Sequence, residues 1–503
     1  MLQDLSFPLL TCFFFLFILL NIWTKSKAKC QNHKLPPGPW KLPLIGNLHQ
    51  LASSSSQPHH FLGDLAKKHG PIMKLQLGEV SAIIISSPNS AKELLKTHDT
   101  IFANQPRILA AEVVSYDSLG VFFTPFGDYW RQIRKIYVME LLSAMRVQSF
   151  RTIREEEVLN LIKSVSLSGG LPINLSEKVF SLMNRIISRA AFGKECKYEN
   201  ELIYLLKEAN SLTGVFNLFD VFPSLKFLSF LTSLEKIRKN LDKILDDIIK
   251  DKMQTSAATL ASNDDSGGND VVDVLLEHWG TSELDSNMGR NHIKAITLEV
   301  IFAGSETSAT TIEWAMSELL RNPRVLEKAQ AVVRRVLGGS ENIDETDIQK
   351  LDYLKLVVKE TLRLHPPVAL IPRESSEKRE LSGYMIPSNT KVFINVWAIG
   401  RDPEYWIDAD CFRPERFNNS CIDFKDINFE YIPFGGGKRI CPGISFALAA
   451  IELTLSQLLY HFNWKLPNEI KPEELDMSEL LGLACKRRND LCLVATPWMS
   501  PLS

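Results

Sequence analysis

The segment that most constrains this chain runs from Phe434 to Gly443 and reads Phe-Gly-Gly-Gly-Lys-Arg-Ile-Cys-Pro-Gly. Its three successive glycines lack a Cβ, so the backbone can turn sharply and approach a flat ligand closely. Pro442 suits a first helical position, and the following residues to Tyr460 are apolar with helical character. We therefore expect Cys441 at a helix N-terminus, where the helix dipole and nearby Arg439 lower a thiol pKa. Such a thiolate suits an iron centre as its axial ligand.

The other cysteines leave two alternatives for Cys441. A free cysteine is often a buried, inert thiol. A zinc or iron–sulfur cluster is disfavoured, because the sequence contains no Cys-x-x-Cys pair. Eight cysteines in 503 residues also show no disulfide framework, which suits a reducing cytosol. These residues are Cys12, Cys30, Cys196, Cys411, Cys421, Cys441, Cys485 and Cys492.

Charged residues upstream of this loop recur at helical spacing. Glu360 and Arg363 share a helix face, and Pro366 with Pro367 ends that helix. Further along the chain, Arg416 lies in the run Pro-Glu-Arg-Phe. Taken alone, Glu360 and Arg363 would be an ordinary surface pair that contributes little stability.

A long helical pattern from about Met288 to Leu320 contains the polar run Ala303-Gly304-Ser305-Glu306-Thr307-Ser308. Glycine, serine and threonine lower helix propensity, and hydroxyl side chains compete for backbone carbonyls. We therefore expect a local opening of the helix here. The alternative is a helix with one polar face. Trp130 and Arg134 also share a helix face, within a basic segment that could equally be solvated.

Together these segments resemble the cytochrome P450 superfamily, whose haem-ligand loop reads F-x-x-G-x-R-x-C-x-G. The resemblance covers the whole chain and implies a mainly α-helical prism with a small β region, preceded by one N-terminal transmembrane helix. It implies haem b with Cys441 as the metal ligand, Thr307 and Glu306 as the catalytic alcohol and acid, and NADPH used indirectly through a reductase. It also implies that Glu360, Arg363 and Arg416 form a structural ion network. The implied haem-binding residues are Trp130, Arg134, Arg373, Phe434, Gly435 and Arg439.

The N-terminus predicts where the protein resides. Residues Phe7 to Trp23 are almost continuously apolar, at the short end of the length that spans a membrane. Lys25, Lys27 and Lys29 follow, which predicts a cytosolic catalytic domain on the endoplasmic reticulum. A cleaved secretory signal is the alternative, but the positive charges follow the apolar run and no small-x-small cleavage site precedes them.

We expect three segments: a membrane anchor at 1–29, a stiff proline-rich hinge at 30–58 and a haem-thiolate domain at 59–503. An SH3 ligand is an alternative for the prolines, disfavoured by their position directly after an anchor. The 45% hydrophobic and 23% charged residues are typical of a globular protein, and a net charge of −2 predicts no nucleic-acid partner. Length alone suggests roughly three domains, but the motifs must converge on one cofactor.

Secondary structure follows from periodicity. We expect strands at Ile72–Leu77, Ala82–Ser86 and Val392–Val396. Helices are expected at Arg151–Ser164, Leu202–Leu212, Leu234–Met253, Leu319–Leu337 and Ile444–Tyr460. The polar stretch Gln254–Asp270 is expected to be a mobile surface connection.

The resemblance also implies an apolar distal pocket. An apolar pocket with few polar anchors favours a hydrophobic substrate, although many apolar residues simply pack. Its lining is expected to include Leu119, Phe122, Ala303, Val368, Leu370 and Leu481.

The Pro-Pro-Gly-Pro hinge, the Tyr129–Lys135 segment and the Ala303–Ser308 run look most similar to plant A-type members. Within that group the chain resembles hydroxylases of casbene-type diterpenes, which form alcohols and, on repeated oxidation, ketones. Sesquiterpene, monoterpene and indole-alkaloid oxidases share much of the pattern.

A reductase-independent isomerase is disfavoured, because such relatives typically lose the alcohol at position 307. A gas sensor or an electron carrier is a further alternative; a carrier needs two strong axial ligands, and the sequence shows one convincing ligand motif.

Overall fold

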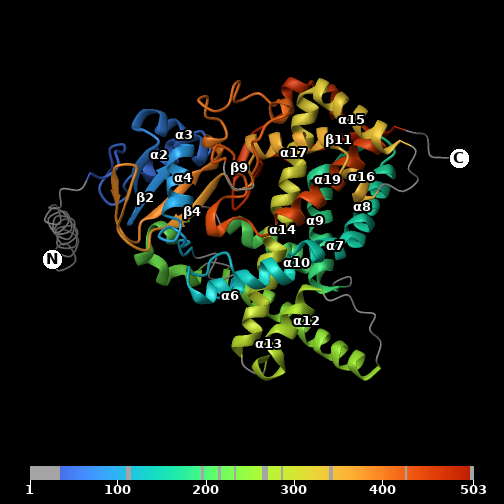
Figure 1. Cartoon of the computed structure of the whole chain (residues 1–503), viewed down its shortest axis with the longest axis horizontal. Coiled ribbons are helices and arrows are strands. Elements are labelled where there is room, and N and C mark those ends of the chain that lie inside the picture. Colours follow the sequence, from blue (N-terminus) through green and yellow to red (C-terminus); the bar gives the residue numbers. More distant parts are fainter. Residues whose placement is uncertain are drawn as a thin grey trace, which may run out of the picture.

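The computed structural model describes residues 34–108, 115–193, 197–212, 217–231, 234–262, 270–284, 287–338, 344–424 and 428–498. It is mainly helical with a small β region, as expected from the sequence (Figure 1). The expected anchor at 1–29 lies outside the described residues.

A four-stranded sheet lies beside the helices, in the order β1-β2-β7-β4 (Figure 1). Its strands are β1 (Ile72–Leu77), β2 (Val80–Ile85), β7 (Lys391–Asn395) and β4 (Leu370–Glu374). The pair β2–β7 is parallel, and the other two pairs are antiparallel. The expected strand pair is confirmed, although β2 begins two residues earlier than predicted. The turn between β1 and β2 contains Gly78 in a left-handed conformation, with φ 58°.

Three smaller sheets complete the β structure. Their orders are β10-β9, β3-β11-β8 and β5-β6. The strands are β3 (Pro172–Asn174), β5 (Arg379–Leu381), β6 (Tyr384–Ile386), β8 (Phe462–Lys465), β9 (Glu479–Leu481), β10 (Cys485–Arg487) and β11 (Cys492–Pro497).

The first helices along the chain are mostly short, and the longer helices follow later in the chain. The first group is α2 (Leu48–Ser53), α3 (Pro58–His69), α4 (Pro88–Lys92), η1 (Glu93–Thr97), α6 (Asp128–Ile136), η2 (Tyr137–Leu141) and α7 (Ala144–Ser149). The second is α8 (Arg151–Ser166), α9 (Leu175–Phe192), α10 (Glu199–Leu212), α11 (Leu218–Val221), η3 (Pro223–Leu231), α12 (Leu234–Ser262) and α13 (Val271–Leu284). The third is α14 (Asn287–Arg321), α15 (Pro323–Leu337), α16 (Glu345–Ile348), α17 (Asp352–Leu364), α18 (Val396–Ile399) and α19 (Ile444–His461). Short turns are η4 (Pro414–Phe417), η5 (Gly437–Arg439), η6 (Pro467–Glu469) and η7 (Pro472–Glu474).

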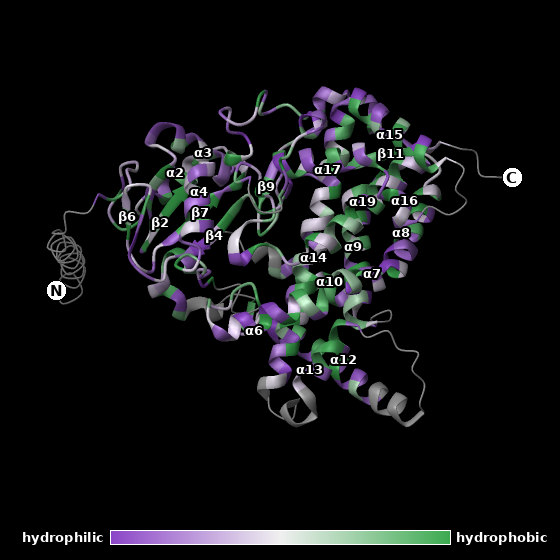
Figure 2. Ribbon diagram, in the orientation of Figure 1, coloured by the Kyte–Doolittle hydropathy of each residue, from purple (hydrophilic) through white to green (hydrophobic). Residues whose placement is uncertain are grey.

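Helix α14 runs through the middle of the molecule and packs against α9, α13, α17 and α19 (Figure 1). Its buried residues include Ile296, Ile301 and Ile312, none of which is measurably exposed. Hydrophobic residues concentrate in the strands and on the inner helices, whereas polar residues lie outside on helices such as α8 and α15 (Figure 2). The core therefore holds α14 on several sides.

Two predicted helix boundaries were wrong. The stretch Leu319–Leu337 is not one helix, because α14 ends at Arg321 and α15 starts at Pro323. Proline has no N–H to continue the helix and disfavours helical geometry in the residue before it. Helix α12 continues to Ser262, nine residues beyond the predicted end at Met253. Much of the expected connection at 254–270 is therefore helical, and residues 263–269 of it lie outside the described residues.

The proline-rich segment lies along β1 rather than standing free of the sheet. The N–H of Lys74 donates to Pro37 O at 2.7 Å, and the N–H of Gln76 donates to Asn47 Oδ1 at 2.8 Å. Asn47 is buried and donates in turn to Trp40 O at 2.9 Å. These bonds fix the direction in which the chain leaves the sheet.

Among the described residues, α19 alone has the length and composition of a membrane-crossing helix. Half of that span is buried, and α19 packs against α8, α14 and α15. It is therefore a core helix.

Candidate active site

The loop around Cys441 is held by its own backbone. The N–H of Cys441 donates to Phe434 O at 3.0 Å, and the N–H of Gly435 donates to Ile432 O at 3.0 Å. Gly435 and Gly437 adopt left-handed conformations, with φ 74° and 67°. A Cβ on Gly437 would also collide with the carbonyl oxygen of Leu95. Glycine is therefore required at position 437 for both conformation and space.

The predicted start of the helix behind Cys441 at Ile444 is confirmed. Pro442 and Gly443 form a turn, and α19 begins at Ile444. In this turn the Gly443 N–H points back to the Cys441 sulfur. Burial raises the pKa of the half-buried Cys441 thiol, while the Gly443 N–H and the Arg134 charge oppose the rise. The protein surroundings therefore do not produce the lowered pKa expected from the sequence.

Three arginines predicted to bind a cofactor lie together beside this loop. Arg134 on α6 donates to Ile440 O at 2.5 Å, and Arg439 donates to Val121 O at 2.9 Å and Phe122 O at 3.0 Å. Arg373 on β4 donates to Pro372 O at 2.8 Å, and its Nε has no partner among the described residues.

Burial lowers the pKa values of all three guanidinium groups, and repulsion from the other two adds to the effect at Arg439. Burial, then the charges of Arg373 and Arg134, lower the pKa of Arg439 to about 9. Burial lowers the pKa of Arg373 to about 10, and it also lowers that of Arg134. A cluster of buried cations with an unsatisfied Nε fits a ligand that carries carboxylates, as haem does.

Trp130, predicted to bind the haem, lies against Arg439 of this cluster. Its indole N–H donates to Val121 O at 3.0 Å, and the Arg439 guanidinium lies 4.9 Å from its ring centroid. The tryptophan therefore orients Arg439 and the loop before it by a cation–π contact.

Glu360, Arg363 and Arg416 form a buried ion network. Arg363 makes two 2.8 Å bonds to the Glu360 carboxylate, and Arg416 Nε donates to the same carboxylate at 2.8 Å. Arg363 also donates to Gly400 O and Ala409 O, each at 2.6 Å. The network joins α17 to the chain that precedes the cysteine loop.

Helix α14 is unbroken where a local opening was expected, so that prediction was wrong. The Thr307 hydroxyl donates to Ala303 O at 2.7 Å, and the Thr311 hydroxyl donates to Thr307 O at 2.9 Å. These bonds run along the helix and add to its own hydrogen bonds without breaking them. Ala303 is nevertheless exposed and Thr307 half-buried, in the middle of a core helix. Accessible surface at this point fits a helix that faces a bound group.

A cavity of about 650 Å³ lies between α9, α10, α14 and the β9–β10 hairpin. Of the six residues predicted to line a substrate pocket, only Leu481 lines this cavity. Phe122 and Ala303 are exposed, Leu119 and Val368 are half-buried, and Leu370 is buried. Glu306 is buried at 8% exposure and also lines the cavity.

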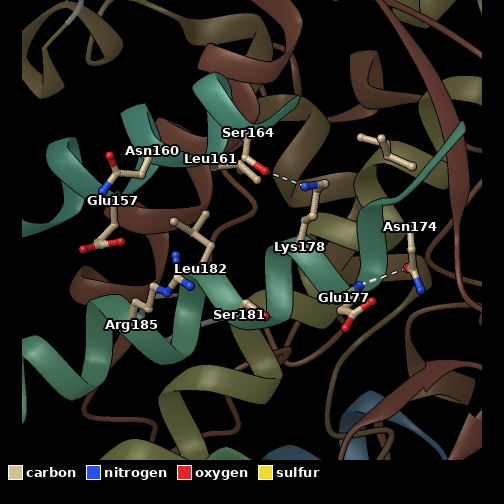
Figure 3. A pocket seen from close by; sticks show the side chains of 11 residues that line it. Glu157, Asn160, Leu161, Ser164, Asn174, Glu177, Lys178, Ser181, Leu182 and Arg185 are labelled. Atoms are coloured by element: carbon tan, nitrogen blue, oxygen red, sulfur yellow. Dashed lines mark hydrogen bonds between the residues drawn. The ribbon is translucent and has the colours of Figure 1, made fainter. Parts of the chain in front are cut away.

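A second, more polar cleft of about 350 Å³ lies between α8 and α9 (Figure 3). Lys178 Nζ donates to Ser164 Oγ at 2.5 Å, and Glu157 accepts from Arg189 at 2.7 Å. None of the predicted site residues lines this cleft.

Glu299 is a site residue that sequence reasoning missed. Its buried carboxylate accepts from the Phe122 N–H at 3.3 Å and from the Tyr137 hydroxyl at 3.2 Å. Burial raises its pKa to about 7, against those bonds and the Arg439 charge. The missed signal is spacing, since Glu299, Glu306 and Glu313 recur every seven residues along this core helix.

Comparison with known proteins agrees with this fold and site. The cytochrome P450 family model matches residues 36–493, and the chain belongs to the cytochrome P450 family. Members carry haem with a cysteine thiolate ligand, and the enzyme is a cytochrome P450 monooxygenase of a plant type. A zebra fish cytochrome P450 solved with abiraterone shares the fold, with a TM-score of 0.74 at 22% identity, over 88% of this chain and 99% of that one.

Three plant relatives match almost end to end. Cytochrome P450 71D8 of Glycine max is 52% identical, over 96% of this chain and 97% of the relative. Premnaspirodiene oxygenase of Hyoscyamus muticus is 51% identical, over 98% of each chain. Melianol synthase CYP71BQ4 of Citrus sinensis is 51% identical, over 98% of this chain and 96% of the relative.

Proposed function

We propose that this monooxygenase hydroxylates a hydrophobic plant terpenoid, with a casbene-type diterpene as the first candidate and a ketone as the product of repeated oxidation. The proposal rests on similarity to a premnaspirodiene oxygenase and a melianol synthase. Each is 51% identical to this chain over 98% of this chain's length. Sesquiterpene, monoterpene and indole-alkaloid substrates are the alternatives within the same group.

The residues around Cys441 fit the prosthetic group. Cys441 would hold the iron, with Phe434 and Gly435 in the loop beside it, while Arg134, Arg373 and Arg439 would bind the two propionates. Haem bound there supplies dioxygen activation and transfer of one oxygen atom to carbon. The Glu360–Arg363–Arg416 network would hold the chain that leads into the loop of Cys441 against α17.

In this proposal, two side chains of α14, Glu306 and Thr307, supply protons to the haem site. Thr307 holds a hydroxyl at a half-buried position beside exposed Ala303. The neighbouring Glu306 carboxyl passes protons to it from the cavity side. A positioned acid of this kind typically accelerates proton transfer by about 10²–10⁴-fold.

An NADPH-cytochrome P450 reductase is the proposed electron donor, and the endoplasmic reticulum membrane the proposed location. Lys438 is exposed beside the Cys441 loop, and Arg131 and Lys135 are exposed on α6. Such cations suit docking of an acidic partner surface. The apolar Phe7–Trp23 segment would anchor the chain with its catalytic domain in the cytosol.

The test is a panel of terpene hydrocarbons fed to microsomes that contain the protein and a plant reductase. We expect an NADPH-dependent product that is heavier by one oxygen atom, detected by mass spectrometry, with casbene among the substrates. A Cys441→Ser variant should lose the thiolate-type Soret band of the reduced, carbon monoxide-treated protein. A wild-type protein without that band would refute the haem assignment, and a normal band without any terpenoid product would refute only the substrate class.

A further inference from the structure

The cavity beside Glu306 contains a second buried carboxyl that the proposed reaction has not used. Glu313 lies seven residues further along α14, two helical turns or about 10.5 Å at 1.5 Å per residue. Both carboxyls line the same cavity, and Glu313 is 7% exposed. At its mouth lie the exposed charged residues Glu177, Lys486 and Asp490. The cavity therefore connects Glu306 to solvent along one face of α14.

The cavity is suited to water. Its volume of about 650 Å³ is many times the ~30 Å³ that one water molecule occupies in the liquid. The Ser305 hydroxyl, 2% exposed, also lines it and has no hydrogen-bond partner in the described part of the chain. Buried hydroxyls nearly always have a partner, and ordered water is the usual one where protein supplies none.

The surroundings of Glu313 place its protonation equilibrium near neutrality. Burial raises its pKa to about 7, and the Asp490 charge adds to the rise. The Ser176 hydroxyl of α9 donates to the carboxyl, and Arg487 and Lys486 of β10 also oppose the rise. A carboxyl with such a pKa can take a proton from solvent and release it again at physiological pH.

We infer that Glu313 is a proton-carrying residue, which passes protons from solvent through water in this cavity to Glu306. The inference rests on the proposed function, in which Glu306 supplies protons for dioxygen cleavage. That reaction consumes RH, O₂, two electrons and two protons, and it yields ROH and H₂O. Glu313 acts through Glu306 and touches neither substrate nor cofactor.

The variant Glu313→Gln tests this role, because it keeps the shape of the side chain and removes the titratable proton. Glu452→Gln is the matched control. Glu452 lies on core helix α19, burial raises its pKa to about 7 as well, and it does not line the cavity. Glu313→Asp keeps a carboxyl and should restore most of the function.

The first readout needs no turnover. Infrared difference spectra of the haem-loaded protein should show a protonated-carboxyl band that titrates near pH 7. Glu299 and Glu452 also have pKa values raised to about 7, so we expect Glu313→Gln to remove one component of this band and Glu452→Gln to remove a different one. A spectrum in which Glu313→Gln leaves the titrating band unchanged would overturn the inference.

The second readout compares two oxidants on a substrate found in the terpene panel. With NADPH and O₂, Glu313→Gln should form roughly tenfold less product per NADPH, with a larger solvent deuterium isotope effect. This loss is smaller than the 10²–10⁴-fold contribution of a directly acting acid, because cavity water can partly replace the carboxyl. With iodosylbenzene, PhIO and RH give PhI and ROH without consuming protons, so the variant should match wild type.

The two-oxidant comparison also separates a structural role from a proton-carrying one. Equal losses with both oxidants would mean that Glu313 only supports the fold, and would overturn the inference. If Glu313→Gln does not fold, Ala309→Leu provides the second variant, since it fills the same cavity without altering a charge. It should give the same oxidant-dependent loss. A wild-type protein without any terpenoid substrate would refute the proposed function, while the infrared titration would still decide the role of Glu313.

Discussion

At the scale of single residues, Gly120 and Glu299 show how one contact sets the shape of the loop before α6. A Cβ on Gly120 would overlap the Glu299 carboxylate. That carboxylate accepts the N–H of Phe122, which carries a predicted pocket side chain, and it lies near Arg439. Glycine at position 120 therefore lets helix α14 hold this loop closely.

Gly120→Ala should displace the Glu299 carboxylate and break its bonds to the loop. We expect a loss of about 1–3 kcal/mol in the free energy of unfolding, the usual cost of overpacking, measured by urea denaturation. Gly127→Ala is the control, because its φ of 176° is extended and a Cβ there would meet nothing within 4 Å. Equal stability of the two variants would contradict the role assigned to the contact.

At the scale of elements, buried charges join segments that are distant in sequence. The Glu360 carboxylate is fully buried and binds Arg363, Arg416 and the backbone N–H of Arg413. The sequence indicated this network through the spacing of Glu360 and Arg363, because two charges on one helix face are visible in one dimension. The backbone bonds to Gly400 and Ala409 were not visible, since they depend on how the later chain folds over α17.

Glu360→Gln should leave two buried guanidinium groups without a carboxylate. We expect a loss of about 3–5 kcal/mol in stability, the range for breaking one side of a buried ion pair, together with reduced haem retention on gel filtration. Lys328→Ala is the comparison. It removes an ion pair with Glu415 in which both side chains are largely exposed, and it should cost less than about 1 kcal/mol. If both variants lost similar amounts of stability, burial would not determine how much Glu360 stabilises the fold.

A second buried cluster joins α3, β9, α17 and α14. Glu479 accepts from His59 at 2.6 Å, from His60 at 2.7 Å and from His365 at 3.1 Å. His365 also bonds to Glu318 at 2.8 Å and stacks on Trp314 with ring centroids 4.0 Å apart. The sequence carried no signal for this cluster, because Glu479 lies 114 residues from His365 and about 420 from the adjacent His59 and His60.

Glu479→Gln should therefore destabilise the contact between the sheet region and the helices. We expect a loss of about 2–4 kcal/mol, because the remaining histidines keep only one carboxylate partner, Glu318. Thermal unfolding followed by circular dichroism would measure it. Asp64→Asn, at an exposed ion pair with Lys67, should be nearly neutral. If Glu479→Gln were as stable as wild type, the cluster would have no structural role.

At the scale of the whole molecule, the sequence predicted the family, the helical architecture and the cysteine loop well. Those features depend on local periodicity and on motifs of a few residues. The unbroken course of α14 through Ala303–Ser308 and the cavity with Glu313 were not predicted. The cavity depends on contacts between elements, because it forms only where α9, α10, α14 and the β9–β10 hairpin meet. Of the residues predicted to line the substrate pocket, Leu481 also lines this cavity.

Buried carboxyls should also make the stability of the whole molecule depend on pH. Burial raises the pKa values of Glu299, Glu313 and Glu452 to about 7 from an ordinary value of 4.5. Between these two pH values the native state binds more protons than the unfolded state. The contribution of each carboxyl to the free energy of unfolding therefore falls as pH rises from about 4.5 to about 7. Above pH 7 this contribution stays constant.

Glu452→Gln isolates one such contribution, because the opposing influence on this carboxyl is only the charge of Lys355. Relative to wild type, the variant should gain about 1–3 kcal/mol in stability between pH 4.5 and pH 7.5, since a shift of one pKa unit corresponds to about 1.4 kcal/mol. Urea denaturation at a series of pH values would measure the difference, and taking the difference cancels groups that both proteins share. If the stability difference between variant and wild type stays constant across this range, Glu452 ionises normally in the folded protein. If the stability difference shrinks as pH rises, the pKa of Glu452 is lowered by folding instead of raised.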